Sequence, residues 1–238
     1  MRIITLCLAA LLTVLSACRT SKESSKTMNT VYIDSTSEVI AYYPQFSRID
    51  LVCGTMPQQS QQEVIFCAEA AFTSKLLEEF AHSNIDGDHV SSGVRHKGAA
   101  CKDNSGAFTW ANGTWRFVMG DYSAALDSAA AQGGMGFGQA VVVCAGKAIT
   151  PLWRGGNNEY RALCEKDGRL CIVDSRGSVE YDEFVRRLVN YGVTHALYLD
   201  MGSGWNHSWW RDNKGTVHEI HPRIEKCRYC TNWITFYK

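Results

Sequence analysis

The sequence predicts an α+β fold: a mixed sheet with antiparallel hairpins, one β-α-β crossover and packed helices. Two dipeptides that favour tight turns, Asn112-Gly113 and Asp167-Gly168, each separate two apolar runs, which is typical of a β-hairpin. Residues 179–191 carry apolar side chains at helical spacing between two apolar strands, which predicts the crossover. Hydrophobic residues make up 45% of the chain and charged residues 20%, which excludes disorder over most of its length.

The chain before residue 108 has short apolar runs separated by turn-forming residues. Pro44 interrupts the first of these runs. Thr73 or Ser74, after the run that ends at Phe72, can cap a helix, because a side-chain hydroxyl accepts a backbone N–H of the first helical turn. In order, we expect strands and a turn within 32–53, a buried strand over 63–68, a helix from Thr73 or Ser74 to Phe80, and a loop over the polar, glycine-rich residues 82–107.

The middle of the chain combines a hairpin, a helix and a glycine-rich segment. The turn at Asn112-Gly113 places Trp110 opposite Trp115, a pair that we expect to pack rather than to act on a ligand. In order, we expect a hairpin over 108–117, a helix over 124–131, a mobile or tightly turned loop over 132–139 because of its four glycines, a strand over 139–144 and a turn over 145–147.

Residues 160–200 carry the clearest pattern. Pairing about Asp167-Gly168 puts Cys164 opposite Cys171 and Arg161 opposite Asp174. The helix that follows ends where Gly192 can cap it, and an apolar strand over 193–199 then leads to Asp200. A strand–helix–strand unit of this length joins parallel strands, so both strands should end at the same edge of the sheet.

Ligands bind at that edge in open α/β sheets, so Asp174, Asp200 and Arg161 form a candidate site there. Gly202 and Ser203 follow directly and can present backbone N–H groups to an oxyanion. Two structural alternatives stay open: a purely structural ion pair of Arg161 with Asp174, and a purely structural role for Asp200 as a cap on the next turn. The residues that we expect to bind substrate are Gly202, Ser203, Trp205, Asn206, His207, Asp174 and Gln139.

The charge balance excludes one class of protein. The chain has 24 basic and 24 acidic residues and a net charge of zero, whereas nucleic-acid binding needs a surplus of Lys and Arg, so we expect no nucleic-acid partner. No apolar run after residue 17 reaches the roughly 18 residues of a membrane span. We expect one domain over 31–238 and a monomer.

The first residues predict export. A basic start, an apolar stretch and Leu15-Ser16-Ala17-Cys18 are typical of a bacterial lipoprotein signal over 1–17, in which Cys18 is lipidated; an ordinary signal peptide is the alternative. Residues 18–30 are polar and predict a flexible tether. Arg19, rather than Asp, after the lipidated cysteine favours the outer membrane of the cell envelope.

Replacing the lipidated residue should separate the anchor from the fold. Cys18→Ser is expected to release the protein from the membrane fraction while the domain still folds, because residues 19–30 carry few apolar side chains for packing. Fractionation followed by immunodetection measures this. A serine variant that stays with the membranes would contradict the lipoprotein prediction.

The cysteines and histidines predict neither a metal nor another cofactor. Eight cysteines remain after residue 18, and in an oxidising compartment we expect fewer than four disulfides. His218, His221, Cys227 and Cys230 are the residue types of a zinc site, but their order matches no common zinc module. Arg95 stands where an EF-hand after Asn84 would need its final Glu, which excludes that calcium site.

Four segments of the chain resemble the phosphodiester glycosidase family, over roughly residues 60–210. They are Glu69-Ala-Ala-Phe72, residues 139–146, Arg161, and Leu199-Asp-Met-Gly-Ser203. Two positions depart from the family pattern: Glu69 stands where the family has Asn, and Met201 replaces the first Gly after the Asp. The resemblance is to a divergent branch of the family.

The resemblance implies a hydrolase that cleaves the bond between a sugar anomeric carbon and a phosphodiester in envelope or capsular glycans. Arg161 would bind the phosphate through its planar fork, and Asp200 would stabilise the transition state or activate water. Glu69 would be the second carboxylate of glycoside hydrolysis. The alternative function is a non-catalytic carbohydrate-binding lipoprotein with the same fold, which the departures at Glu69 and Met201 favour.

Overall fold

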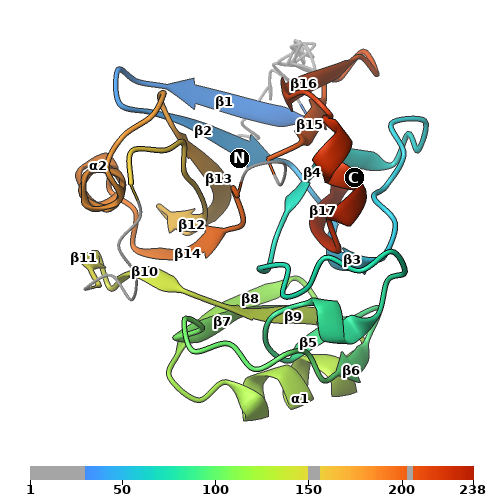
Figure 1. The fold of residues 1–238 in the computed structure, drawn as a ribbon. Helices are drawn as coiled ribbons and strands as arrows, with labels where there is room; N and C mark the ends of the chain where they lie inside the picture. Colours follow the sequence, from blue (N-terminus) through green and yellow to red (C-terminus); the bar gives the residue numbers. More distant parts are fainter. Residues whose placement is uncertain (1–29, 150–155, 203–205) are drawn as a thin grey trace, which may run out of the picture.

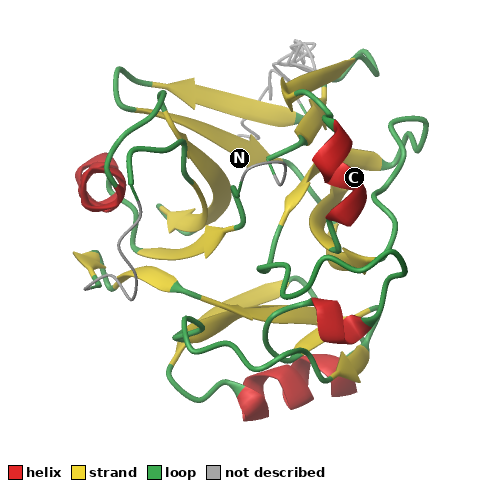
Figure 2. Cartoon of the chain, in the orientation of Figure 1, coloured by secondary structure: helices red, strands yellow, loops and turns green. Residues whose placement is uncertain are grey.

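The computed structural model describes residues 30–149, 156–202 and 206–238, so the predicted signal peptide, Cys18 and most of the tether lie outside the described residues. The described chain folds into seventeen strands, two α-helices and two short 3-10 helices. The strands make three sheets arranged around a common centre (Figure 1), and every strand pairing within them is antiparallel. The fold is therefore α+β but dominated by strands, as Figure 2 shows, and the prediction of a mixed sheet is wrong.

The first sheet has seven strands and carries α2 on its outer face. Its hairpin has the predicted register, with Arg161 opposite Asp174 and Cys164 opposite Cys171. The helix ends at Gly192, whose φ of 92° is the left-handed cap that glycine favours. In sheet order the strands are β1 (Val31–Ser35), β2 (Val39–Pro44), β13 (Arg169–Ser175), β12 (Arg161–Lys166), β14 (His195–Leu199), β10 (Val141–Cys144) and β11 (Lys147–Ala148), and α2 spans Tyr181–Tyr191.

The crossover from β13 through α2 to β14 differs from the prediction in its pairing. Both strands pair antiparallel with β12, which lies between them, so they run parallel to each other without touching. The reason is that β12 holds one side of β13 through the hairpin and β2 holds the other. The two strands nevertheless end at the same edge, which brings Arg161 opposite both Asp174 and Leu199, the residue before Asp200.

The second sheet has five strands and packs against the 3-10 helix η2 (Glu225–Tyr229). β4 is buried along its whole length, as predicted, and Trp209 on the neighbouring strand is also fully buried. In sheet order the strands are β16 (Val217–His221), β15 (Ser208–Arg211), β4 (Val64–Glu69), β17 (Asn232–Tyr237) and β3 (Arg48–Cys53).

The third sheet contains the Asn112-Gly113 hairpin and is covered by α1. Its turn residues have φ of 50° and 78°, and Trp110 lies opposite Trp115, as predicted. In sheet order the strands are β6 (Val94–His96), β5 (His89–Ser91), β9 (Met135–Gln139), β7 (Gly106–Ala111) and β8 (Thr114–Met119), and α1 spans Ser123–Ala131.

Two segments that were expected to be loops form strands of this sheet. Residues 82–107 contain the 3-10 helix η1 (His82–Asn84), β5 and β6, and the glycine-rich segment 132–139 contains β9. The glycines of β9 allow close packing: a Cβ at Gly136 would lie 2.8 Å from a Leu126 methyl of α1, and one at Gly138 would lie 2.3 Å from the Tyr122 hydroxyl. Glycine here serves strand packing rather than a turn.

The helix predicted from Thr73 or Ser74 to Phe80 does not form. The backbone N–H of Thr73 donates instead to the Asp200 carboxylate (3.3 Å), and that of Ser74 donates to the Asn84 carbonyl (2.6 Å). Leu76, an apolar residue of the expected helix, is 56% exposed and therefore does not pack in the core. Tertiary hydrogen bonds therefore replace the helical ones.

The apolar core divides into three parts. The largest lies between the three sheets and includes Phe66, Phe137 and Leu199. A second, with Phe184 and Leu188 of α2, fills the space between that helix and the first sheet, and a third lies around Trp209 beside η2. Among the described residues, no helix is both long and apolar enough to cross a membrane.

Six cysteines are thiols in the described part of the chain: Cys53, Cys67, Cys101, Cys144, Cys164 and Cys171. Cys164 and Cys171 face each other across the β12–β13 hairpin without a disulfide, and Cys67 is buried in β4. Burial, the main cause, raises the pKa of the Cys164 thiol well above its usual value. Cys67, Cys164 and Cys171 therefore behave as small buried hydrophobic groups.

Candidate functional site

Arg161 and Asp174 form a bidentate ion pair at the edge of the first sheet. The Arg161 Nε and Nη2 atoms each donate to one Asp174 carboxylate oxygen at 2.7 Å. Arg161 is 0% exposed, and its third nitrogen, Nη1, is buried without a hydrogen-bond partner among the described residues. The pair that the sequence offered as a structural alternative therefore exists, and it leaves one guanidinium nitrogen unused.

A cavity of about 430 Å³ opens beside this ion pair, between the first and second sheets. Its size falls within the range of small-molecule sites. Met201, directly after Asp200, lies in the wall of the cavity. This is the position at which the phosphodiester glycosidase family, which the sequence resembles, has glycine. Polar and aromatic side chains from both sheets line it, among them Tyr42, Glu159, Asp174, Trp210 and His221.

His221 of β16 is a cavity residue that sequence reasoning considered only as a metal ligand. Its Nε2 lies 4.0 Å from an Asp174 oxygen, and its Nδ1 lies 3.8 Å from a Glu159 oxygen. Burial, followed by the positive charge of Arg161, lowers the pKa of His221, so the ring is neutral at pH 7. The predicted His207 contributes to the same region, because its Nδ1 lies 2.8 Å from the His221 carbonyl. No local sequence pattern predicts that His207 and His221 lie near Asp174. They do so because the second sheet packs beside the first.

Asp200 lies just past the end of β14, and its carboxylate is held by two backbone donors. Gly202 N–H donates to Oδ1 at 3.0 Å and Thr73 N–H donates to Oδ2 at 3.3 Å. The residue is 7% exposed. Burial raises its pKa to about 6, against the opposing effect of the two N–H donors. At neutral pH the group is therefore ionised but close to its titration range.

Glu69, the last residue of β4, is a second buried carboxyl group near Asp200. Burial, and then repulsion from Asp200, raise its pKa well above the usual value. Its Oε1 is buried and has no hydrogen-bond partner within the described residues. The next residue, Ala70, accepts the Asp200 N–H at 3.0 Å, which joins the ends of β4 and β14. Two carboxyl groups with different pKa values are what acid–base chemistry requires.

Gln139 joins the same region but is bonded to the backbone. Its Nε2 lies 3.5 Å from the Ala70 carbonyl, and its Oε1 accepts from the Ala140 N–H at 2.8 Å. The side chain is fully buried. Gln139 at the end of β9 therefore contacts the backbone just after β4, at Ala70.

The structure gathers the predicted site residues into two neighbouring groups. Asp200, Glu69 and Gln139 meet around Ala70, whereas Arg161, Asp174 and His207 lie with His221 beside the cavity. No hydrogen bond or ion pair joins Arg161 to Asp200 among the contacts of the described chain. Gly202 is exposed and Asn206 half-buried, while Ser203 and Trp205 lie outside the described residues.

Comparisons with known proteins bear on the fold. No family model matches the chain, and no curated protein matches its sequence. The zebrafish N-acetylglucosamine-1-phosphodiester alpha-N-acetylglucosaminidase catalytic domain, auto-inhibited by its pro-peptide, is similar with a TM-score of 0.59 and 10% identity, over 89% of this chain and 83% of that one. A hypothetical protein from Synechocystis is similar with a TM-score of 0.50 and 12% identity, over 87% of this chain and 61% of that one. At these identities, the chain shares a distant fold relationship with that catalytic domain.

Proposed function

We propose that the protein is a hydrolase that cleaves the bond between a sugar anomeric carbon and a phosphodiester. The observation that carries the proposal is the pair of buried carboxyl groups, Glu69 and Asp200, at adjoining strand ends. The fold shared with a phosphodiester glycosidase catalytic domain supports it. So does the polar cavity beside Asp174 and Met201.

The proposed reaction uses one proton donor and one proton acceptor. The bond from the anomeric carbon to the phosphate oxygen breaks, and its electron pair stays on that oxygen, which takes the Glu69 proton. A water oxygen bonds to the anomeric carbon and gives its proton to the Asp200 carboxylate. Proton exchange with solvent restores both groups. Arg161 would stabilise the phosphate charge through Nη1, the guanidinium nitrogen that Asp174 does not use.

Isotope labelling identifies the bond that breaks. Hydrolysis of a sugar-1-phosphodiester in ¹⁸O-water is expected to place the label in the anomeric hydroxyl of the released sugar. Label in the phosphate would mean that water attacked phosphorus. The protein would then be a phosphodiesterase, and the assignment of Asp200 as the base at the anomeric carbon would fail.

Glu69→Gln tests the proton donor. Glutamine has nearly the same shape and no charge, so we expect unfolding free energy within about 1 kcal/mol of wild type at pH 7. The proton is lost, so we expect turnover to fall about 10²–10⁴-fold. Because the Glu69 pKa is raised, wild-type turnover should also decline on the alkaline side, and this limb should vanish in the variant. Steady-state rates across pH measure both effects; a fully active Gln variant would exclude the donor role.

A second candidate function is carbohydrate binding without turnover. Two observations favour it: Arg161 is fully buried against Asp174, and Met201 occupies the cavity wall. This function predicts saturable binding of a sugar-1-phosphodiester, measured by calorimetry, with no release of sugar at any pH. Release of free sugar would exclude it.

We also propose that the enzyme acts as a lipid-anchored monomer in the bacterial cell envelope, on envelope or capsular glycans. Leu15 to Cys18 and the polar segment 19–30 support the anchor. The Cys18→Ser fractionation described above tests this part by itself, because lipid attachment and catalysis fail independently.

A further inference from the structure

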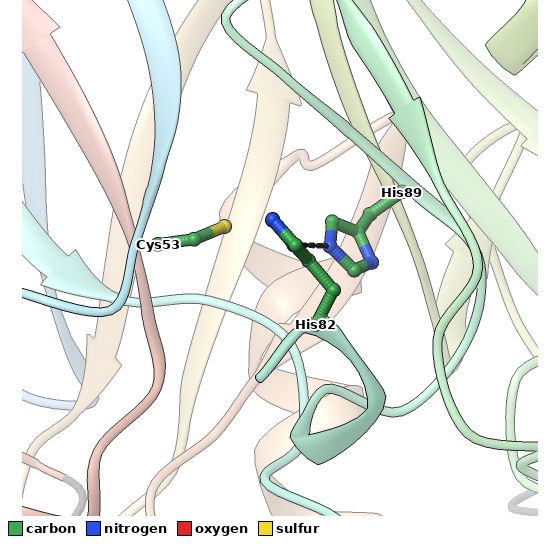
Figure 3. Close-up of side chains that lie close together, drawn as sticks. All are labelled: Cys53, His82 and His89. Carbon is green, nitrogen blue, oxygen red and sulfur yellow. Dashed lines mark hydrogen bonds between the residues drawn. The ribbon is translucent and has the colours of Figure 1, made fainter. Parts of the chain in front are cut away.

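Three metal-ligating side chains outside the candidate site converge between two sheets. Cys53 ends β3 of the second sheet, His82 begins η1, and His89 begins β5 of the third sheet. Figure 3 shows the Cys53 sulfur and the two imidazole rings turned toward one another. One ligand atom from each lies within 4.8 Å of the other two. We propose that Cys53, His82 and His89 bind a zinc ion.

The hydrogen bonds of the two histidines leave a lone pair directed into the cluster. His89 Nδ1 lies 3.1 Å from the Gly87 carbonyl, which can only accept, so Nδ1 carries the proton. The other nitrogen of a neutral His89 ring, Nε2, therefore presents a lone pair, and it lies 2.9 Å from His82 Nδ1. A backbone carbonyl that fixes the tautomer is the usual outer partner of a metal-bound histidine.

Ring packing fixes the orientation of the more exposed His82. Its ring stacks on His96 with 3.4 Å between centroids and 9° between planes. Phe80 contacts the same ring edge-on at 5.3 Å. His89 itself is 0% exposed, so two of the three ligands are held in place by their surroundings. His96 lies over the face of His82 rather than beside it, which gives it a supporting role.

The donor set selects the metal. Two imidazole nitrogens and one thiolate suit zinc, whereas magnesium and calcium prefer oxygen ligands. Zinc–nitrogen and zinc–sulfur bond lengths place tetrahedral ligand atoms about 3.3–3.6 Å apart. The two histidine nitrogens, which lie 2.9 Å apart, must therefore separate slightly, and small side-chain shifts must bring the sulfur to bonding distance. On binding, the Cys53 thiol releases its proton to solvent, and the His82 ring changes tautomer: Nδ1 gives up its proton and Nε2 takes one from solvent, so the ring binds as a neutral imidazole. Water completes the fourth position.

The zinc ion would link three parts of the fold, namely β3, η1 and β5. β3 and β5 already touch through the Ser91 hydroxyl, which donates to the Leu51 carbonyl at 2.7 Å. His82 adds the segment after Phe72, in which Asn84 accepts the Ser74 N–H and Thr73 N–H donates to Asp200. The site therefore fixes the segment that holds the Asp200 carboxylate, and zinc should raise the melting temperature.

Zinc titration of the full chain tests the proposal. The protein is stripped with a chelator under reducing conditions and titrated with Zn²⁺ against a chromophoric competitor. We expect one zinc per chain, and affinity more than about 100-fold lower in Cys53→Ser and in His89→Gln, because a lost ligand costs more than a lost outer partner. Cobalt(II) should show a thiolate charge-transfer band that is absent from Cys53→Ser.

Two control variants and a measurement on wild type distinguish loss of a zinc ligand from loss of the fold. Cys144→Ser removes another half-buried thiol and His96→Phe keeps the stacked ring without its nitrogens; both should bind zinc like wild type. X-ray absorption of the zinc-loaded wild type should show one sulfur and two imidazoles, whatever the variants do to folding. Undiminished zinc affinity in Cys53→Ser, or a zinc environment without sulfur, would show that the cluster is only a hydrogen-bonded histidine pair beside a thiol.

Discussion

Arg161→Lys is expected to lower turnover of a sugar-1-phosphodiester by about 10²–10³-fold, nearly as much as Arg161→Ala. Lysine keeps the charge but has a single nitrogen, which cannot hold both Asp174 oxygens and a phosphate together. Initial rates at saturating substrate measure the effect. A fully active lysine variant would show that Arg161 only balances the charge of Asp174.

The burial of Arg161 predicts a stability effect as well. Arg161→Ala leaves the Asp174 carboxylate buried without its partner, which typically costs about 3–5 kcal/mol of unfolding free energy. Denaturant unfolding measures the cost.

A double variant separates the two roles. Arg161→Met with Asp174→Leu replaces the ion pair by apolar groups and should recover most of the lost stability. If Arg161 acts on the phosphate, this stable variant stays inactive. Recovery of turnover together with stability would mean that the ion pair is only structural.

Asp200→Asn is expected to abolish most turnover while stabilising the protein at neutral pH. Raising the pKa of a carboxyl group from 3.8 to about 6 by burial means that its ionised form costs about 3 kcal/mol in the folded state. Asparagine removes that cost but also weakens one of the two N–H contacts, so we expect a smaller net gain. Melting temperature and steady-state rates at pH 7 measure the two changes.

The pH dependence has a defined sign. The folded protein binds the Asp200 proton more tightly than the unfolded chain, so this group's contribution to stability is present at acid pH and is lost as pH rises through about 6. Wild type should therefore gain about 2 kcal/mol relative to Asp200→Asn between pH 7 and pH 4. Asp182→Asn replaces an exposed carboxylate on α2 and keeps Asp200, so this control should have the same pH profile of stability as wild type. Equal pH profiles for wild type and Asp200→Asn would contradict the raised pKa.

Local chemistry made part of the fold predictable. Asn112-Gly113 and Asp167-Gly168 adopt positive φ in tight turns, and each turn alone fixes the register of its hairpin. The Arg161–Asp174 pair follows from that register, so one half of the candidate site was derived from residue order. The position of Asp200 at the same sheet edge followed from strand direction, even though β12 separates the two parallel strands.

The remaining features depend on contacts between distant segments. The glycines of β9 looked like a loop because the sequence does not show that α1 and Tyr122 press against them. The helix before Phe80 looked plausible because its competing partners, Asp200 and Asn84, come from elsewhere in the fold. His221 joins the cavity only because the second sheet packs against the first.

The most direct test of the proposed hydrolysis is release of sugar from a sugar-1-phosphodiester by the full chain. Free sugar and phosphate monoester are quantified together over time, for wild type and for Asp200→Asn. We expect equal amounts of the two products from wild type, with a rate that falls below pH 6 as Asp200 is protonated, and almost none from the variant. Saturable binding without either product at any pH, or equal rates from wild type and variant, would contradict it.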